Sequence, residues 1–451
     1  MLRRLRPRPR RLLRHRRPRG RNRRRGREGR NRAYGAYRAY SRRAHALNSN
    51  LMQRINPWLS RFGKLLVAAT FCLIFLGGMV TSVNAGLSVP DWPTSYGYNM
   101  FTFPMARWVG GVFFEHTHRL WATGVGLMTT VLVAWIWRNR WAVPAALLVC
   151  VAATGAAVVS LPHVAGLGGP EHLQTRGLII MHVNIWSFAA AFVVMLLTTE
   201  QDRWRYGKPW LQWLGFGAFL LVCAQGTLGG LRVTQVSTVL AMIHACTAQA
   251  FLCLTVVMAA ALSPRWEAEV LATGVLGRGV PAVKALAWTL VGAVYCQLMI
   301  GAVMRHLHAG LSIPDFPLAF GRLIPPMLNE RVAIHFAHRV GAAVVTVIAL
   351  TLVTVTMLTA ASRHARLRRV ALGLIGAVAV QVALGASVIW MQREPVITSL
   401  HVVNGAVVLA TALLLAMRAT KLNTLLQPES GSWSQIDDDA NETAPREEAH
   451  A

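Results

Sequence analysis

Long apolar runs, separated by short polar segments, recur along this chain of 451 residues. Each run approaches the roughly 20 residues that a helix needs to cross the hydrocarbon core of a bilayer. Helices are expected because lipid offers no partners for unpaired backbone groups. The pattern predicts about ten transmembrane helices, at residues 64–84, 117–137, 142–162, 178–198, 211–231, 239–261, 284–304, 333–358, 370–390 and 397–417.

The composition supports a membrane protein and argues against a soluble domain. Hydrophobic residues make up 54% of the chain and charged residues only 14%, whereas soluble domains carry about 25% charged residues. All six cysteines lie within predicted helices and none forms a CxxC pair, so we expect neither a disulfide nor a cysteine metal site. The sequence therefore predicts an all-α integral membrane protein whose main partner is the lipid bilayer.

The net charge of +29 comes mostly from the N-terminal segment. Residues 1–43 hold twenty arginines and one acid, Glu28, and so contribute +19 (twenty minus one). Such a segment cannot bury a core, and we interpret residues 1–60 as a basic, disordered tail without a nucleic-acid partner. An alternative interpretation places the true start of translation at Met52.

Lysines and arginines in the loops predict the orientation. The segments WRNRW (137–141), DRWRYGK (202–208) and SRHARLRR (362–369) fall on one side of a ten-helix path. Positive residues favour the cytoplasmic side, so both termini are expected there. We predict a multi-pass protein of the plasma membrane.

Two stretches 224 residues apart almost copy each other: NAGLSVPDWPTSYG at 84–97 and HAGLSIPDFPLAFG at 308–321. Further matches follow in the same order in both parts of the chain, which predicts two pseudo-symmetric four-helix bundles. They are EHTHR (115–119) with HFAHR (335–339), QGTLGG (225–230) with QVALGA (381–386), and MIHACTAQA (242–250) with SLHVVNGAV (399–407).

The spacing of these matches predicts the domain organisation. The offset falls from 220 to 157, so the first half carries 63 extra residues, which fit an inserted two-helix hairpin at 140–203. The first half spans 61–262 with this hairpin, and a cytoplasmic linker covers 263–283. The second half spans 284–420, and 421–451 form an acidic cytoplasmic tail.

Four histidines occupy matching positions near the outer ends of predicted helices: His118, His244, His338 and His401. Ionisable groups within a membrane usually mark function, and imidazoles on facing helices can hold haem iron. The pattern favours two haem sites, one per half. The alternative is that each histidine is simply hydrogen-bonded within its bundle.

Other histidines are weaker candidates. His182, in the inserted hairpin, rivals His244 because it follows the first histidine by 64 residues, close to the 63 residues within the second pair. The Gln-to-His spacing, 19 residues in the first half and 20 in the second, favours His244. His116, His306 and His308 rank lower, because they point elsewhere or lack a counterpart.

Charged residues flank the predicted ligands. Arg119 and Arg339 each follow one directly, and an arginine there could pair with a haem propionate or snorkel to the interface. Glu115 shares a helix face with His118, and its counterpart is His335. This asymmetry favours chemistry in the first half and electron transfer in the second; the alternative is a solvated interfacial acid.

The repeated loops are stiffened by prolines on both sides of an acid and an aromatic residue. Trp92 and Phe316 could pack on the edge of a macrocycle, and Asp91 and Asp315 are expected to cap turns. The two loops would then cover the two sites as lids.

The ordered, duplicated set of motifs resembles the haem A synthase family, membrane enzymes of cytochrome oxidase assembly that oxidise haem O. The resemblance covers about residues 60–420, except the insertion. It rests on EHTHR (115–119), QGTLGGLRV (225–233), IHACTAQ (243–249), AHRVGA (337–342) and LHVVNGA (400–406).

The resemblance implies an eight-helix core that oxidises one methyl of haem O, through an alcohol, to the formyl group of haem A. Haem b is the implied cofactor in the second half, with His338 and His401 on the iron and Arg339 beside it. The substrate haem O is implied in the first half. Its residues are His118, His244 and Arg119, with Glu115 as the catalytic residue.

The chain departs from the family in two ways. Some members carry a cysteine pair in the first outer loop, but residues 85–110 contain no cysteine. The insertion is also outside the expected pattern. Implied partners are the enzyme that supplies haem O and oxidase assembly proteins; the sequence does not identify the electron donor, and it leaves a homo-oligomer open.

Two other classes remain open from the sequence. A two-haem cytochrome b-type electron carrier acting with quinone needs the same histidines but not Glu115. A parallel-repeat transporter is the third class, and the absence of interrupted helices in the sequence pattern argues against it.

Overall fold

The computed structural model is all-helical over the part of the chain that it describes. The described residues are 56–137, 145–153, 155–156, 209–264, 266, 279–327, 329–359, 361 and 364–425, together with single positions between 175 and 193. Eight of the described helices are long and apolar enough to cross a membrane. They are α2 (Pro57–Ser82), α3 (Gly110–Ile136), α6 (Pro209–Thr234), α7 (Thr238–Ala261), α9 (Val280–His306), α10 (Glu330–Leu358), α11 (Ala365–Trp390) and α12 (Pro395–Leu425).

These helices confirm the predicted all-α membrane fold. Polar caps mark several starts. The side chains of Asn56, Ser237 and Asn329 accept N–H groups of the first turns of α2, α7 and α10. The inserted hairpin is described only in part: residues 145–153 are helical, and Cys150 Sγ donates to the Ser187 carbonyl at 3.0 Å. Most of the insertion, both predicted tails and the linker lie outside the described residues.

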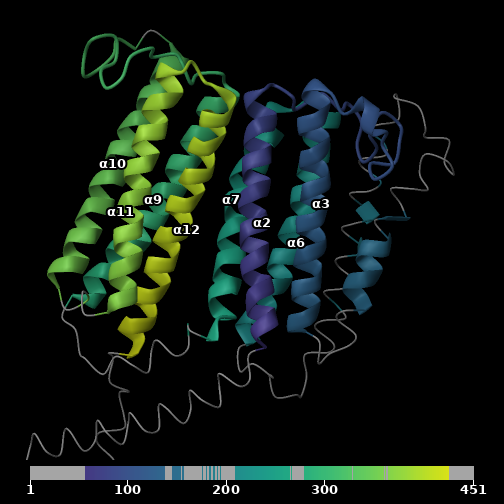
Figure 1. The fold of residues 1–451 in the computed structure, drawn as a ribbon, viewed down its shortest axis with the longest axis horizontal. Helices are drawn as coiled ribbons and strands as arrows, with labels where there is room; N and C mark the ends of the chain where they lie inside the picture. The colour runs from purple at the N-terminus through teal and green to yellow at the C-terminus, as the bar shows by residue number, and fades with distance from the viewer. Residues whose placement is uncertain are drawn as a thin grey trace, which may run out of the picture.

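Each half is a closed ring of four helices, and the halves stand side by side (Figure 1). In the first half α2 contacts α3, α3 contacts α6, α6 contacts α7, and α7 returns to α2. In the second half α9, α10, α11 and α12 repeat the same circuit. Both long loops, 83–109 and 307–329, lie at the same end of the bundle. This agrees with the duplication predicted from the sequence.

The two halves meet through α2 against α12 and α7 against α9, with α7 also touching α12. Since α2 corresponds to α9 and α7 to α12, the first two contacts are equivalent. An apolar cluster fills the boundary, with Ile74 from α2, Leu252 and Val256 from α7, and Ala406 and Ala410 from α12.

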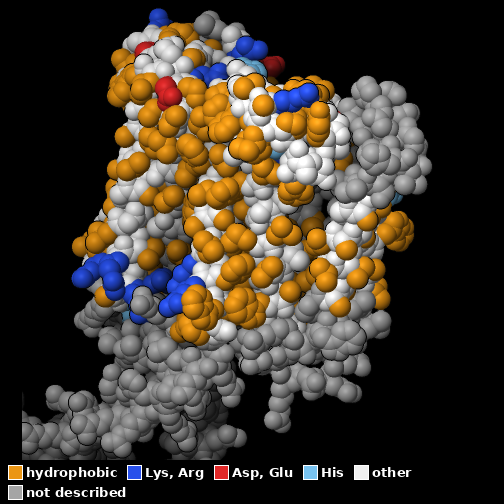
Figure 2. Space-filling model, turned by 45° about the vertical axis from the view of Figure 1, so that its right-hand side comes forward, with side chains coloured by type: hydrophobic (Ala, Val, Ile, Leu, Met, Phe, Trp, Pro, Cys, Tyr) orange, Lys and Arg blue, Asp and Glu red, His pale blue; other side chains and the backbone are white. Residues whose placement is uncertain are grey.

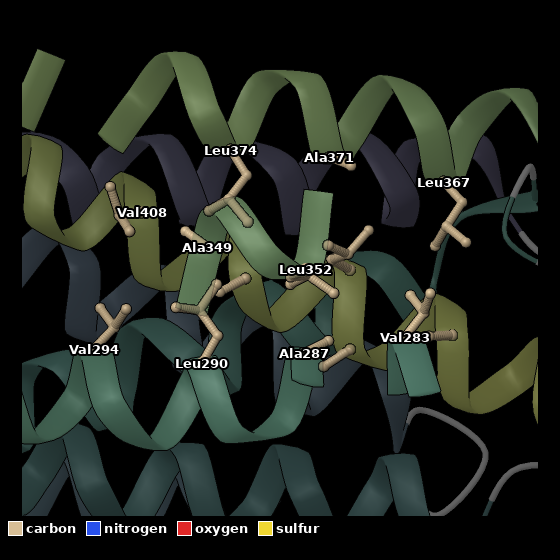
Figure 3. Close-up of a cluster of buried hydrophobic side chains, with 14 of the residues drawn as sticks. Val283, Ala287, Leu290, Val294, Ala349, Leu352, Leu367, Ala371, Leu374 and Val408 are labelled. Carbon is tan, nitrogen blue, oxygen red and sulfur yellow. The ribbon is translucent and has the colours of Figure 1, made fainter. Parts of the chain in front are cut away.

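Small residues let the helices of the second half approach closely (Figure 3). Lipid tails are as apolar as leucine, so helix association in a bilayer depends on close van der Waals packing rather than on transfer from water. Ala287, Ala349 and Ala371 are fully buried where α9, α10 and α11 meet. Hydrophobic side chains cover the middle of the visible surface, and most basic ones lie towards its two ends (Figure 2), as expected for a bilayer-spanning bundle.

The two loops have matching backbones. Asp91 accepts the N–H groups of Tyr96 and Gly97 at 2.6 and 2.8 Å. Asp315 accepts the two corresponding groups at 2.7 and 2.8 Å. The residues at the turns have similar left-handed φ angles, 52° at Tyr96 and 54° at Phe320. The prediction that both aspartates cap turns is confirmed.

We predict that Asp315 makes the second loop sensitive to acid. The Gly321 N–H, with that of Phe320, holds the pKa of this exposed carboxyl below its ordinary value. Its stabilising contribution is therefore complete above about pH 4, the usual Asp value, and is lost as the pH falls through the lowered value. Thermal unfolding in detergent should show a difference between wild type and Asp315→Ala that is constant at neutral pH and shrinks in acid. A difference unchanged at about pH 2 would contradict this account.

Candidate functional site

All four predicted ligand histidines lie at one depth, near the end of the bundle that carries the loops. His118 and His338 are the ninth residues of α3 and α10. His244 and His401 are the seventh residues of α7 and α12. A rise of about 1.5 Å per residue places them roughly 9–12 Å along their helices.

Each imidazole lies against a glycine of a neighbouring helix. A Cβ atom added at any of the four glycines would come within 3.0–3.3 Å of the ring's Cε1 atom, closer than ordinary van der Waals contact. A side chain there would displace the ring. The pairs are Gly77 with His118, Gly229 with His244, Gly301 with His338, and Gly385 with His401.

A cavity of about 990 Å³ is lined by all four histidines. It extends between the halves, and its wall includes Glu115 and the loop residues Trp92 and Phe316. The Trp92 ring also lies directly on Gly230 of α6, and Phe316 packs edge-on to Trp390 with 6.1 Å between ring centroids. Both loops therefore cover the cavity, as predicted for lids.

The second-half pair fits a single iron atom. The ring centroids of His338 and His401 are 6.4 Å apart, with an angle of 67° between the planes. A metal atom held between two imidazoles requires about 6 Å between the ring centroids. Each metal–nitrogen bond is roughly 2 Å long, and each ring nitrogen lies roughly 1 Å from its centroid. Groups of three or more metal-ligating side chains are absent from the described residues. Haem iron needs only axial protein ligands, so the donor set suits haem rather than a bare metal ion.

In the first half, the structure brings His118 together with His244. Both line the cavity and are close enough to interact electrostatically. His182 is exposed and does not line the cavity. The geometry therefore favours His244 over its rival from the insertion.

Glutamines hold the partner histidines of both halves. The Gln381 amide donates to the His401 carbonyl at 3.1 Å and faces Nδ1 at 3.3 Å, while Asn404 fixes its oxygen at 2.8 Å. Gln225 makes the equivalent contact in the amide orientation that satisfies both of its ends, donating to His244 Nδ1 at 2.7 Å. These contacts fix the orientation of the two imidazoles.

A third glutamine distinguishes the halves. Gln297 donates to the His338 carbonyl at 2.7 Å and contacts its Nδ1 at 3.0 Å. Its own Oε1 is buried without a partner among the described residues. The equivalent first-half residue is Leu73, and the Nδ1 atom of His118 has no hydrogen-bond partner among those residues. A glutamine side chain therefore contacts the His338 ring, whereas the His118 ring has the Leu73 backbone in the corresponding place.

Arg119 holds the first loop rather than pointing a free fork into the cavity. Its Nη1 atom donates to the carbonyls of Asp91 and Thr94 at 2.6 and 3.1 Å. Its Nη2 atom donates to Val89 O at 2.7 Å and to Glu115 Oε1 at 2.8 Å. The four terminal N–H groups are thus engaged, which leaves only Nε for the propionate contact predicted from the sequence.

Arg339 makes the same contacts in the second half. It donates to the carbonyls of Ile313 at 3.2 Å, Asp315 at 2.7 Å and Leu318 at 2.8 Å. These three acceptors are the repeat counterparts of those around Arg119. Neither arginine snorkels to the interface, the alternative considered from the sequence; both tie a loop to a helix.

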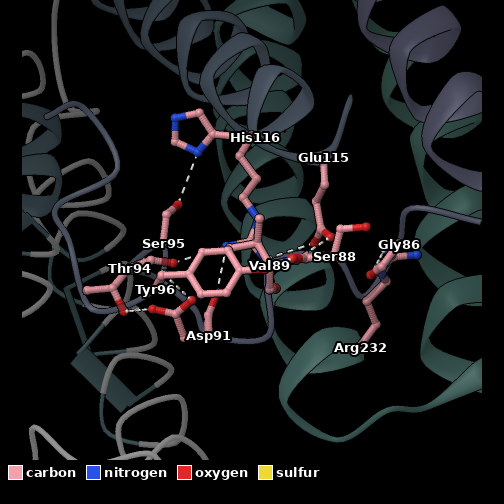
Figure 4. A network of polar contacts seen from close by, with 11 residues as sticks. Gly86, Ser88, Val89, Asp91, Thr94, Ser95, Tyr96, Glu115, His116 and Arg232 are labelled. Atoms are coloured by element: carbon pink, nitrogen blue, oxygen red, sulfur yellow. Dashed lines mark hydrogen bonds and ion pairs between the residues drawn. The ribbon is translucent and has the colours of Figure 1, made fainter. Parts of the chain in front are cut away.

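Glu115 is buried, with 2% of its surface exposed, so it is not a solvated interfacial acid. Val89 N–H donates to its Oε2 atom at 2.9 Å (Figure 4), and Arg119 forms an ion pair with Oε1. In the second half, Ile313 N–H donates to His335 Nδ1 at 3.2 Å. An anionic carboxylate and a nitrogen acceptor therefore occupy equivalent positions.

The remaining histidines have different surroundings. His116 is fully buried under the first loop, where Nδ1 contacts Ser95 Oγ at 3.1 Å and the ring packs on Phe103 and Trp108. His306 lines the cavity. Sequence reasoning missed three further cavity residues, all arginines: Arg232, Arg305 and Arg393. One signal in the sequence could have identified them: they are basic residues at the outer end of the bundle, whereas the basic loops lie at the other end.

Comparison with known proteins identifies the class to which this fold and site belong. Residues 175–413 match the family model COX15-CtaA, described as cytochrome oxidase assembly protein. The chain belongs to this family, and the resemblance predicted from the motifs is confirmed. The matched range includes residues 175–203 of the predicted insertion, which we expected to lie outside the family pattern.

Several relatives are named haem A synthase. The protein from Symbiobacterium thermophilum is 34% identical over 189 residues, covering 41% of this chain and 60% of its own length. That from Halalkalibacterium halodurans is 21% identical over 360 residues, covering 80% and 96%. That from Bradyrhizobium sp. is 30% identical over 226 residues, covering 46% and 59%. For the first and third of these relatives, the alignment spans about three fifths of the relative's length.

We predict that a larger side chain at a glycine that contacts a histidine ring releases haem. In Gly385→Val the new Cβ would stand 3.1 Å from His401 Cε1, and its methyl groups would push the imidazole aside. Haem affinity should fall roughly 10- to 100-fold, measured as Soret absorbance per purified protein. Gly376→Val is the matched control, because a Cβ at this position of α11 meets nothing within 4 Å. Equal haem loss in both variants would contradict a specific ring contact.

We predict that Gln297→Leu, which copies the first-half residue, loosens His338. Haem affinity of the second half should drop roughly 10-fold or more, and the low-spin electron paramagnetic resonance signal should shift because the ring can turn. Gln212→Leu is the control, since Gln212 lies outside the cavity lining and contacts the Ile136 carbonyl. An unaltered signal and full haem retention would show that Gln297 does not position the ring.

Proposed function

We propose that this protein is a haem A synthase, which oxidises a methyl group of haem O to the formyl group of haem A. The observation that carries the proposal is the set of four glycine-seated histidines around one cavity. Family membership and the names of the relatives support it.

The two halves take different porphyrins in this proposal. His338 and His401 hold haem b as the resident cofactor, with Gln297 fixing the first ring. His118 and His244 receive haem O, and the lack of a glutamine beside His118 suits a ligand that must be exchanged as product. When bound, haem b would supply one-electron transfer.

Glu115 is the proposed catalytic residue. Converting a methyl to a formyl group removes two hydrogens from the carbon, adds one oxygen and withdraws four electrons. An external oxidant and oxygen source must supply the last two changes, and hydrogens that leave as protons need an acceptor at the edge of the porphyrin. A buried carboxylate lining the cavity, one helical turn from His118, can accept such a proton. Arg119 keeps it in place through the ion pair. His335 has the equivalent position in the second half, where no such chemistry is required.

The same asymmetry separates a synthase from an electron carrier. A carrier of cytochrome b type would need both histidine pairs but gains nothing from a buried carboxylate in one half only. We further propose a plasma-membrane location with cytoplasmic termini, the haem O-supplying enzyme as a partner upstream, and oxidase assembly proteins downstream.

The test is the pigment content of purified Glu115→Gln. This change removes the charge but keeps an oxygen for Val89 N–H. Haem b should remain bound and haem O should accumulate, while haem A formation falls roughly 10²- to 10⁴-fold. Extraction and chromatography of the pigments measure all three. Glu330→Gln, an exposed acid at the start of α10, is the control and should behave as wild type.

Three outcomes would contradict the proposal in part or in full. Unchanged haem A output from Glu115→Gln would remove the catalytic role of this residue. Wild-type protein that holds haem b but never haem O or haem A, even in cells that supply haem O, would identify an electron carrier. A preparation without Soret absorbance would exclude both.

A further inference from the structure

Three arginines line the loop-bearing end of the cavity. Arg232 comes from α6, Arg305 from α9, and Arg393 from the turn before α12. We call them the cavity arginines. Among the described residues, the ion pair of Arg119 with Glu115 includes none of the three. Glu115 also interacts electrostatically with Arg232, but one paired carboxylate cannot balance three further arginines, so positive charge is in excess here.

Arg305 crosses from the second half into the first. Its Nη2 atom donates to the Gly78 carbonyl and to Ser82 Oγ of α2, both at 2.6 Å. Its Nε–H is buried and has no hydrogen-bond partner among the described residues. Arg305 also interacts electrostatically with His401 and Arg393. One side of the guanidinium is anchored, and a donor remains at the second site.

Arg232 is likewise anchored at one atom and lies near the histidines of the first site. Its Nη2 atom donates to the Gly86 carbonyl at 2.7 Å (Figure 4). It is close enough to interact electrostatically with both His118 and His244. This single anchor fixes the head group and leaves other N–H groups of the guanidinium for a ligand.

Leaving these cations uncompensated would be costly. A charge within the membrane that lacks a counter-ion is costly. Glu115, which interacts electrostatically with Arg232, is already bound by Arg119. An anionic ligand in the cavity would remove this cost. Haem carries two carboxylates on one edge, and the fork of an arginine pairs with a carboxylate through two parallel hydrogen bonds.

We propose that the cavity arginines bind the porphyrin carboxylates, Arg232 in the first half and Arg305 with Arg393 in the second. The inference rests on the proposed haem sites and adds the residues that recognise the anionic edge. It reassigns the role predicted for Arg119 and Arg339, whose N–H groups hold the loops. The arrangement does not follow the repeat, because Thr81 and Val388 are the counterparts of Arg305 and Arg232.

The test compares haem with haem dimethyl ester, which lacks the carboxylate charges. Full-length protein from haem-deficient cells is titrated with each, and binding is followed by Soret absorbance. A His118→Ala background isolates the second site for Arg305→Met, and His338→Ala isolates the first for Arg232→Met. Wild-type sites should prefer haem roughly 10- to 100-fold, and each arginine variant should lose most of that preference at its own site.

Two further variants make the comparison specific. Arg322→Met changes an exposed arginine at the tip of the second loop and should keep the full preference. Arg305→Lys keeps the charge that bridges the halves and should retain an intermediate preference, so a folding defect of Arg305→Met does not remove the test.

Two results would overturn the inference. One is an arginine variant that binds haem but discriminates against the ester as strongly as wild type. The other is wild type that binds haem and ester equally, as expected if a lipid phosphate neutralises the arginines. Failure of the proposed function is separate, because it would appear as no haem binding or no haem A in wild type.

Discussion

The close approach of an imidazole to a glycine on the next helix is the contact on which this structure depends. It occurs four times, at 3.0–3.3 Å from the position of the missing Cβ. Lipid gives helices no hydrophobic reason to associate, so each ring must fit its neighbour by shape. Because the contacts lie at one depth in both halves, the rings surround a shared cavity instead of filling it.

The outer loops are tied to the helices that carry the histidines. Arg119 and Arg339 each bind three loop carbonyls from one turn below the loop, so the cover of the cavity and its histidine-bearing wall are joined through one side chain per half. Within this shared frame, two substitutions create different environments. Glu115 in the first half corresponds to His335 in the second and supplies an acid, and Leu73 corresponds to Gln297 and lacks its hydrogen bond to the histidine ring. A duplicated scaffold can thus acquire two roles without any change of backbone.

The sequence predicted the helices, the duplication, the caps of the loops and the pairing of His118 with His244 rather than His182, because apolar runs and repeat spacing are properties of the chain itself. It did not predict what Arg119 contacts, since that depends on how closely a loop approaches a helix in three dimensions. Arg232 and Arg305 were missed for another reason: neither has an arginine at its repeat-equivalent position, so comparing the halves could not reveal them. Gln297 escaped notice in the same way. Most of the insertion lies outside the described residues.

The matched boundary contacts, α2 with α12 and α9 with α7, have a consequence for the origin of the fold. They are the self-complementary contacts of a twofold symmetric pair, now made within one polypeptide. Neither four-helix ring encloses the cavity alone, because each supplies only part of its wall. A single four-helix unit with these two faces would therefore need a second copy of itself to close the same cavity.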